Sequence, residues 1–104
     1  MDDYTRRKLL KLIGEKIQNS RKGKLTQEQL AKDLKMTRTS ITNIETGNQG
    51  VQIDTLWQIA DILGASIQEL LPTKDEMGTV YEQVPEDIDK KWIEEVKKEV
   101  EKYE

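Results

Sequence analysis

Two short amphipathic segments joined by a tight turn, within residues 26–46, constrain the fold of this chain more than any other sequence feature. Thr26, followed three residues later by Gln29, has the pattern of a capping box at the start of a helix. Thr37 can cap a second helix, which ends before Gly47, a residue that readily adopts the left-handed backbone found after helices. Two short helices separated by such a turn form a helix-turn-helix arrangement. We therefore expect a chain that packs helices against one another.

Helical periodicity continues on both sides of this arrangement. Leu9, Ile13 and Ile17 recur at steps of four, which predicts an amphipathic helix over residues 3–20. Gly14 lies inside this helix at a cost of about 1 kcal/mol relative to Ala, so we expect another helix to pass close to it. The two helices expected after the arrangement have their apolar positions at Leu56, Ile59, Ala60 and Leu63 and at Ile67, Leu70 and Leu71, with a capping box at Ser66 and Glu69.

The chain divides into three parts. Pro72 follows the last of five expected helices and marks the end of a compact unit. Pro85 suits the first turn of a further helix, and the acidic residues after it suit the positive end of the helix dipole. We therefore predict an all-α fold with a domain at residues 1–72, an irregular linker at 73–84 and an acidic amphipathic helix at 85–104.

Composition narrows the functional classes. The 104 residues include no Cys and no His, which excludes thiolate and imidazole metal sites, disulfides and Ser-His or Cys-His catalytic pairs. The net charge is −3, but residues 1–72 carry 11 basic and 9 acidic side chains, whereas residues 73–104 carry 6 and 11. No apolar run approaches the roughly 18 residues that a membrane span needs, and no signal-peptide core follows Met1. We expect a cytoplasmic protein with no membrane association, no cofactor and no metal.

The second helix of the arrangement has an unusual exposed face. Its two apolar residues, Ile41 and Ile44, define the buried side, and the opposite side has no carboxylate. Short hydroxyl and amide side chains can read the edges of DNA bases, and an arginine can reach a guanine or a phosphate. Taken alone, such a face can also arise by chance on a surface helix. At about 100° per residue, the exposed residues are Thr39, Thr42, Asn43 and Thr46, with Arg38 at the edge.

Several short motifs follow one another over just over half of the chain. They are Ile13-Gly14 with Ile17, Leu25-Thr26-Gln27 with Leu30-Ala31, Thr37-Arg38-Thr39-Ser40-Ile41, Ile44-Glu45-Thr46-Gly47, Asp54-Thr55-Leu56 and Ile59-Ala60-Asp61-Ile62-Leu63-Gly64. In this series the chain resembles the Cro/CI-type (XRE) helix-turn-helix family of phage and bacterial repressors. The resemblance implies a five-helix, repressor-like domain. It also implies a sequence-specific DNA-binding transcriptional regulator, a repressor that binds an inverted-repeat operator as a homodimer through the major groove.

The resemblance further implies which residues meet DNA. Residues of the exposed face would contact base edges, and polar residues at helix ends would contact the phosphate backbone. Gln27, which opens the first helix of the motif, would in addition brace the recognition helix. The implied base contacts are Arg38, Thr39, Thr42 and Asn43, and the implied backbone contacts are Gln27, Thr37 and Asn48.

Four other positions carry structural expectations from the resemblance. Arg21 and Glu45 match a pair that forms a partly buried ion pair in this family, so we interpret them as structural rather than functional. Lys35 occupies the turn position where the family usually has Gly, so we expect a mildly strained left-handed backbone there. Val51 stands where Pro is usual, which should leave that loop looser.

Two regions are candidates for contacts between chains. The first is the short helix with Ile67, Leu70 and Leu71, which we interpret as a dimer surface near the DNA. Trp57 is a separate position outside these two regions. It follows the core residue Leu56, so we expect it to be half exposed, either beside the recognition helix or in a dimer contact. The second is an apolar stripe of the C-terminal helix, which could fold back on the first helix, self-associate or bind a partner protein. This stripe consists of Ile88, Trp92, Val96 and Val100.

Two classes of function remain after these considerations. The leading hypothesis is the transcriptional regulator, with double-stranded DNA and a second copy of the chain as partners. The alternative is an antitoxin or another protein-interaction module whose C-terminal helix binds a partner protein. An enzyme fits poorly, because catalysis without His or Cys would need clustered carboxylates, and the acidic residues are spread over helix surfaces.

Overall fold

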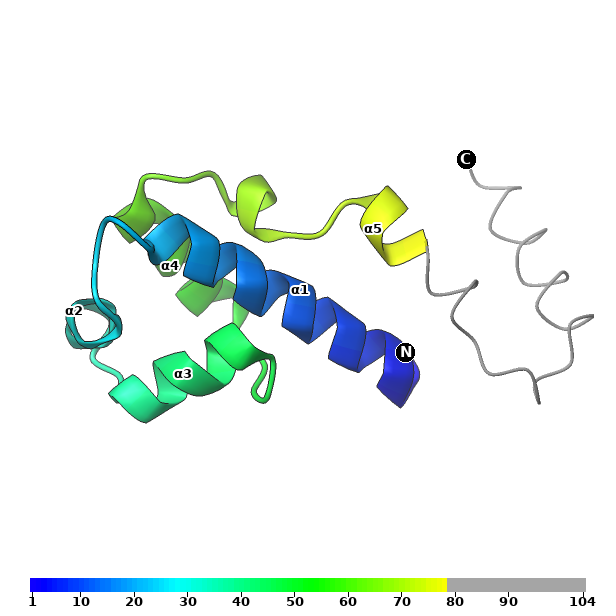
Figure 1. Ribbon diagram of the computed structural model, residues 1–104, viewed down its shortest axis with the longest axis horizontal. Coiled ribbons are helices and arrows are strands. Elements are labelled where there is room, and N and C mark those ends of the chain that lie inside the picture. Colours follow the sequence, from blue (N-terminus) through cyan, green and yellow to red (C-terminus); the bar gives the residue numbers. More distant parts are fainter. Residues whose placement is uncertain (79–104) are drawn as a thin grey trace, which may run out of the picture.

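The computed structural model describes residues 1–78, and every regular element within them is helical (Figure 1). The all-α prediction is confirmed for this part of the chain. The elements are α1 (Asp3–Arg21), α2 (Gln27–Leu34), α3 (Arg38–Thr46), α4 (Ile53–Leu63), the 3-10 helix η1 (Ile67–Leu70) and α5 (Lys74–Gly78). The helix expected at 85–104, with Ile88, Trp92, Val96 and Val100, lies outside the described residues.

The helices begin and end at the residues that the capping patterns predict. The Thr26 hydroxyl accepts a hydrogen bond from the Gln29 N–H at 3.1 Å, and the Gln29 side chain accepts one from the Thr26 N–H at 2.9 Å. Thr37 caps α3 in the same way by accepting from the Ser40 N–H at 3.1 Å. Gly47 ends α3 with φ of +79°, in the left-handed region that glycine adopts without strain. These local bonds satisfy backbone groups that a helix end leaves unpaired.

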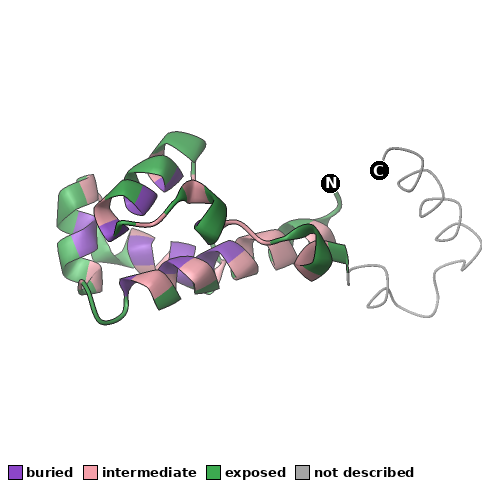
Figure 2. Cartoon of the chain, turned by 90° about the horizontal axis from the view of Figure 1, so that it is seen from above, coloured by how far each residue is buried: buried purple, intermediate pink, exposed green. Residues whose placement is uncertain are grey.

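Helix α1 runs through the middle of the domain, with α3 on one side and η1 on the other (Figure 1). The buried residues of each helix face inward and the outer faces are exposed (Figure 2). The main core consists of Ile13, Ile17, Ile44, Leu56, Ile59, Ala60, Leu63 and Leu70, and a second, smaller cluster of Leu30, Ala31 and Ile41 joins α2 to α3. Within residues 1–78, no helix is both long and apolar enough to cross a membrane.

Gly14 marks the place where α1 and α3 cross, as its position inside a helix predicts. A Cβ atom built on Gly14 would lie only 2.5 Å from the main-chain oxygen of Glu45 and 2.8 Å from its carbonyl carbon. One turn earlier, the main chain of Lys11 packs in the same way against Gly47. Helix α3, the expected recognition helix, is therefore held against α1 by direct contact between the two main chains.

The turn between α2 and α3 contains the expected departure from ordinary backbone geometry. Lys35 adopts φ of 57° and ψ of 40°, and it is the one non-glycine residue with positive φ among residues 1–78. Its N–H donates to carbonyl oxygens in the last turn of α2 and so ends the helix. Glycine would adopt this left-handed backbone without strain, whereas Lys35 carries a Cβ atom there.

Residues 73–78 depart from the irregular linker that the sequence suggested. Lys74–Gly78 forms the short helix α5, which begins with a capping box between Thr73 and Glu76. Lys16 of α1 reaches the Glu76 carboxylate at 3.1 Å, so α5 is attached to α1. The sequence analysis missed this helix because it is too short for apolar periodicity, although the Thr73 to Glu76 capping pattern is a signal for its start.

The short helix η1 also differs from expectation. In a 3-10 helix, side chains three positions apart lie on the same side, so Ile67 and Leu70 both face the domain. Leu70 is 1% exposed inside the core, and Ile67 and Leu71 pack against the same core. The prediction of a dimer surface on this helix is therefore wrong for Leu70, which completes the core of its own chain.

Candidate nucleic-acid interface

Helix α3 exposes one polar face because its other face packs against the rest of the domain. Ile41, Ile44 and Glu45 are buried against α1 and α2. Thr39 and Thr46 are exposed, and so is Arg38, whereas the neighbouring Thr42 and Asn43 are half-buried. The arrangement that the helical wheel predicts is thus present, with the two inner members of the face partly covered.

An ion pair fixes α3 from its buried side. Arg21, the last residue of α1, donates from Nε to Glu45 Oε2 at 2.5 Å and from Nη2 to Glu45 Oε1 at 3.0 Å. The Arg21 side chain is 10% exposed and the Glu45 side chain 1%. Arg21 also donates to the carbonyl oxygen of Leu25 at 3.1 Å. Hydrogen bonding to Glu45 raises the pKa of the Arg21 guanidinium above its ordinary value, so Arg21 stays charged. Arg21 and Glu45 thus form the contact that the resemblance to the family implies.

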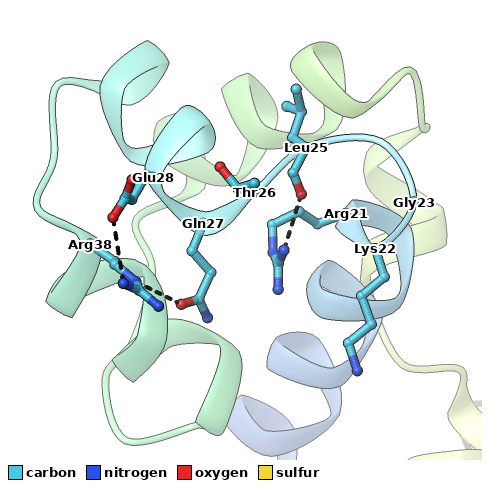
Figure 3. Close-up of a pocket in the computed structure, with 8 residues that line it drawn as sticks. All are labelled: Arg21, Lys22, Gly23, Leu25, Thr26, Gln27, Glu28 and Arg38. Atoms are coloured by element: carbon cyan, nitrogen blue, oxygen red, sulfur yellow. Dashed lines mark hydrogen bonds and ion pairs between the residues drawn. The ribbon is translucent and has the colours of Figure 1, made fainter.

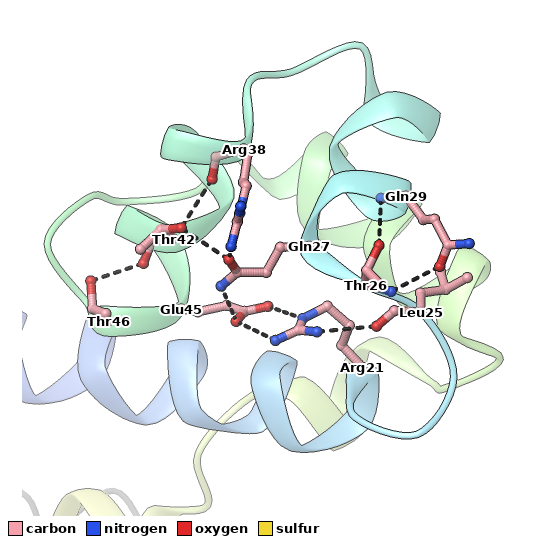
Figure 4. A network of polar contacts seen from close by, with 9 residues as sticks. All are labelled: Arg21, Leu25, Thr26, Gln27, Gln29, Arg38, Thr42, Glu45 and Thr46. Atoms are coloured by element: carbon pink, nitrogen blue, oxygen red, sulfur yellow. Dashed lines mark hydrogen bonds and ion pairs between the residues drawn. The ribbon is translucent and has the colours of Figure 1, made fainter.

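Gln27 links this ion pair to the outer face (Figure 4). Its Nε2 donates to Glu45 Oε1 at 3.0 Å, and its Oε1 accepts from Thr42 Oγ1 at 3.2 Å. Arg38 Nε donates to the same Gln27 oxygen at 3.4 Å. The first residue of α2 therefore contacts three residues of α3 along its length, which is the bracing role expected of Gln27.

Two of the three threonine hydroxyls of α3 have acceptors for their proton within the domain. Thr42 Oγ1 lies 3.1 Å from the Arg38 carbonyl oxygen and 3.2 Å from Gln27 Oε1, and its proton goes to one of these two oxygens; Thr46 Oγ1 donates toward the Thr42 carbonyl oxygen at 2.9 Å (Figure 4). Each hydroxyl has one proton. Thr42 and Thr46 can therefore offer a ligand their oxygen lone pairs and methyl groups, which suit an amino group or the methyl group of thymine.

A polar cleft of about 480 Å³ opens where α1 ends and where α2 and α3 begin (Figure 3). Lys22, Gln27 and Arg38 line it together with the N-cap residue Thr26. Arg38 Nη1 lies 3.5 Å from the carboxylate of Glu28, and both side chains are largely exposed. This exposed pair is worth little energy, but it holds Arg38 at the rim of the cleft. The sequence did not indicate this pair, because its members lie on different helices.

The three residues expected at the DNA backbone lie around α3. Gln27, at the start of α2, contacts α3 along its length, and Thr37 caps the beginning of α3, where its hydroxyl also donates to Ser40 Oγ at 3.0 Å. The N–H groups of the first turn of α3 therefore suit an anion better than this occupied hydroxyl does. Asn48 lies after the C-terminal end and is exposed.

Helix α4 carries an apolar surface that the sequence only partly indicated. Trp57 is 65% exposed, more than the half that was expected. Ile53, one turn earlier on the same helix, is 69% exposed. Large apolar side chains this exposed on one helix face are typical of surfaces that meet another molecule.

Two comparisons with known proteins return matches to this chain. Residues 17–70 match the model of a helix-turn-helix family. Control protein C.BamHI of Bacillus amyloliquefaciens is 36% identical over 62 residues, which cover 58% of this chain and 76% of that protein. No solved structure matches the chain significantly. The stretch matched by the family contains α2, α3 and both members of the buried ion pair.

Proposed function

The chain belongs to the Cro/CI-type (XRE) helix-turn-helix family, whose members are DNA-binding transcriptional regulators, and from this premise we propose that it is a repressor that binds an inverted-repeat operator as a homodimer. The name of the related control protein supports a regulatory role. A regulator acts where the DNA is, so the proposal includes a cytoplasmic location. An enzymatic activity is no part of it.

The observation that carries this proposal is the outward face of α3. It is polar, lacks carboxylates and is held by main-chain packing and a buried ion pair, so it can enter the major groove without rearranging the domain. We propose that base edges are contacted by Arg38, Thr39, Thr42 and Asn43, and that the backbone is contacted by Gln27, by the first turn of α3 at Thr37, and by Asn48.

The dimer follows from the limited reach of one recognition helix. A single helix reads only a few base pairs, so two copies bound about 34 Å apart supply the specificity that an operator needs. Because Leu70 is buried, we place the contact between copies on Ile53 and Trp57 instead. Aromatic residues are enriched at such interfaces. Trp57→Ala should shift the chain toward monomer in sedimentation, whereas Gln58→Ala, an exposed neighbour, should not.

Selection of bound duplexes from a random pool tests the proposed function. The wild-type chain should recover two related half-sites in inverted orientation. Asn43→Ala should lower affinity for the recovered duplex by up to a hundredfold, or about 1–3 kcal/mol, and relax preference at one base pair. Asn19→Ala, the same chemical change on the exposed surface of α1, serves as the control. Failure to recover any consensus would refute sequence-specific binding, and an unaltered consensus with Asn43→Ala would refute the assigned face.

A further inference from the structure

A second cleft lies at the opposite end of α3, and none of the proposed base contacts accounts for it. It measures about 460 Å³ and opens between the first half of α1 and the loop that follows α3. In Figure 1, α1 extends past this loop, so its first turns project beyond the C-terminal end of α3. The polar side chains of the cleft come from Asp3, Arg6, Arg7 and Lys11 on one wall and from Thr46 and Asn48 on the other.

The charge of this cleft is positive. Three of its side chains are cations and one is a carboxylate, and Asp3 is paired with Arg7 Nε at 3.1 Å. Arg6 and Lys11 are exposed, and neither forms an ion pair with any of the residues 1–78. Two cationic groups therefore remain for an anion from outside the domain.

The walls of the cleft are held at a fixed separation. A Cβ atom built on Gly47 would lie 2.8 Å from the Cα of Lys11, so the loop and α1 are in main-chain contact. The guanidinium of Arg6 crosses to the loop, where its Nη2 lies 3.6 Å from the position of a Cβ built on Gly50. Arg6 and Lys11 thus stand beside Asn48 without any rearrangement of the helix.

The length of α3 relates this cleft to the one at the start of the helix. Nine residues of helix measure roughly 13 Å, and the major groove is about 12 Å wide with a phosphate backbone along each edge. Groups at both ends of a helix this long can therefore reach phosphates on opposite edges of the groove. The cleft with Lys22 and Arg38 faces one edge, and the cleft with Arg6 and Lys11 is placed for the other.

We propose that Arg6 and Lys11 of α1 form a second phosphate-binding site, which holds the DNA backbone at the edge of the groove beyond the C-terminal end of α3. This site rests on the proposed function, because it requires α3 to lie in the groove. Its contribution is affinity without sequence preference, since guanidinium and ammonium groups contact phosphates that are the same in every sequence. It makes the first helix, and not only the helix-turn-helix, part of the DNA-binding surface.

The test is the salt dependence of binding for the double variant Arg6→Gln with Lys11→Gln. Two duplexes of about 30 base pairs are titrated, one recovered by selection with the wild-type chain and one of scrambled sequence. Each lost phosphate contact makes the slope of log affinity against log salt less steep by about 0.9, and a homodimer of the double variant loses two contacts in each copy, so on the selected duplex the steepness should fall by about 3.6. Between about 50 and 200 mM salt, the affinity of the double variant for the selected duplex should then fall roughly a hundredfold less than that of the wild type. Both duplexes should bind more weakly, and the selected consensus should not change.

Two further variants separate a local contact from a general effect of charge. Lys32→Gln with Lys35→Gln removes the same charge from exposed side chains that line neither cleft, and it should leave the slope close to that of the wild type. Arg6→Lys with Lys11→Arg retains both charges and should retain the slope. Circular dichroism verifies that each variant is folded.

An unchanged slope for the Gln double variant, or a loss equal to that of the Lys32 and Lys35 control, would overturn the site. These results would leave the proposed function standing if Asn43→Ala still alters the consensus. Failure of the wild type to select a consensus would refute the proposed function instead. In that case the scrambled duplex still decides whether Arg6 and Lys11 contact phosphate.

Discussion

Replacing Gly14 by Ala tests whether contact between two main chains positions the recognition helix. In an isolated helix, this change is stabilising by about 1 kcal/mol. Here the new Cβ would lie 2.5 Å from the carbonyl oxygen of Glu45, whereas an ordinary carbon–oxygen contact is about 3.3–3.6 Å. The two helices must therefore separate by about 1 Å, because main-chain atoms cannot move aside by changing rotamer. Overpacking of this kind costs about 1–3 kcal/mol. Because the clash at Gly14 is with main-chain atoms, we expect the cost of Gly14→Ala to lie at or above the upper end of this range.

The expected net effect of Gly14→Ala is a loss of about 2 kcal/mol, after the gain in helix propensity is subtracted. For a domain of this size, that loss lowers the melting temperature by roughly 8–16 °C. Thermal unfolding followed by circular dichroism measures it, with Asn19→Ala as a matched change on the exposed side of the same helix. The control should be neutral or slightly stabilising, by up to about 0.7 kcal/mol. A Gly14→Ala variant as stable as the wild type would show that α1 and α3 are not held by this contact.

Three other changes test separate features. Glu45→Ala leaves Arg21 buried without its partner, so the free energy of unfolding measured in urea should fall by about 3–5 kcal/mol. A decrease below about 1 kcal/mol would mean that the ion pair is solvated in solution. Lys35→Gly relieves the left-handed backbone and should raise the free energy of unfolding by up to about 1 kcal/mol, and a decrease in the same assay would contradict the strain. The Thr73 N–H donates to the Glu76 carboxylate, and this bond, followed by Lys16, lowers the pKa of Glu76 below its ordinary 4.5. The contact of α5 with α1 should therefore be intact above pH 4.5 and be lost as the pH falls through that lowered pKa. NMR titration of the Thr73 amide measures this, and a midpoint at or above pH 4.5 would contradict the prediction.

The parts of the fold that sequence reasoning identified are those encoded within a few residues. Helix starts at Thr26 and Thr37 depend on side chains three positions from the amides they cap, and the end at Gly47 depends on one residue. Gly14 indicated a close helix crossing because few other reasons place glycine inside an amphipathic helix. The pairing of Arg21 with Glu45 joins residues 24 positions apart, and it was expected only from the resemblance to a family.

The parts that sequence reasoning missed depend on how whole helices are placed. Glu28 meets Arg38, ten positions away, only because α2 and α3 pack against each other. Helix α5 carries a capping pattern at Thr73 and Glu76 but no apolar periodicity, and its contact with α1 through Lys16 depends on how the two helices are placed. Leu70 was assigned to a dimer surface because the apolar positions of a short helix do not show whether they face the core of their own chain or a second copy; the packing of η1 against α1 and α4 decides it.

On α3, the residues that pack against the domain are different from the residues on the exposed face, and this separation bears on how the protein could change its DNA target. The residues that anchor the helix, two isoleucines and Glu45, are separate from Thr39 and Asn43 on the outer face. Under the proposed base contacts, substitutions at Thr39 or Asn43 should change the recognised sequence while the scaffold keeps its stability, which would make the helix a site for divergence after gene duplication and for directed retargeting. Thr42 is the exception, since its hydroxyl contacts Gln27, and changes there should alter both recognition and helix placement.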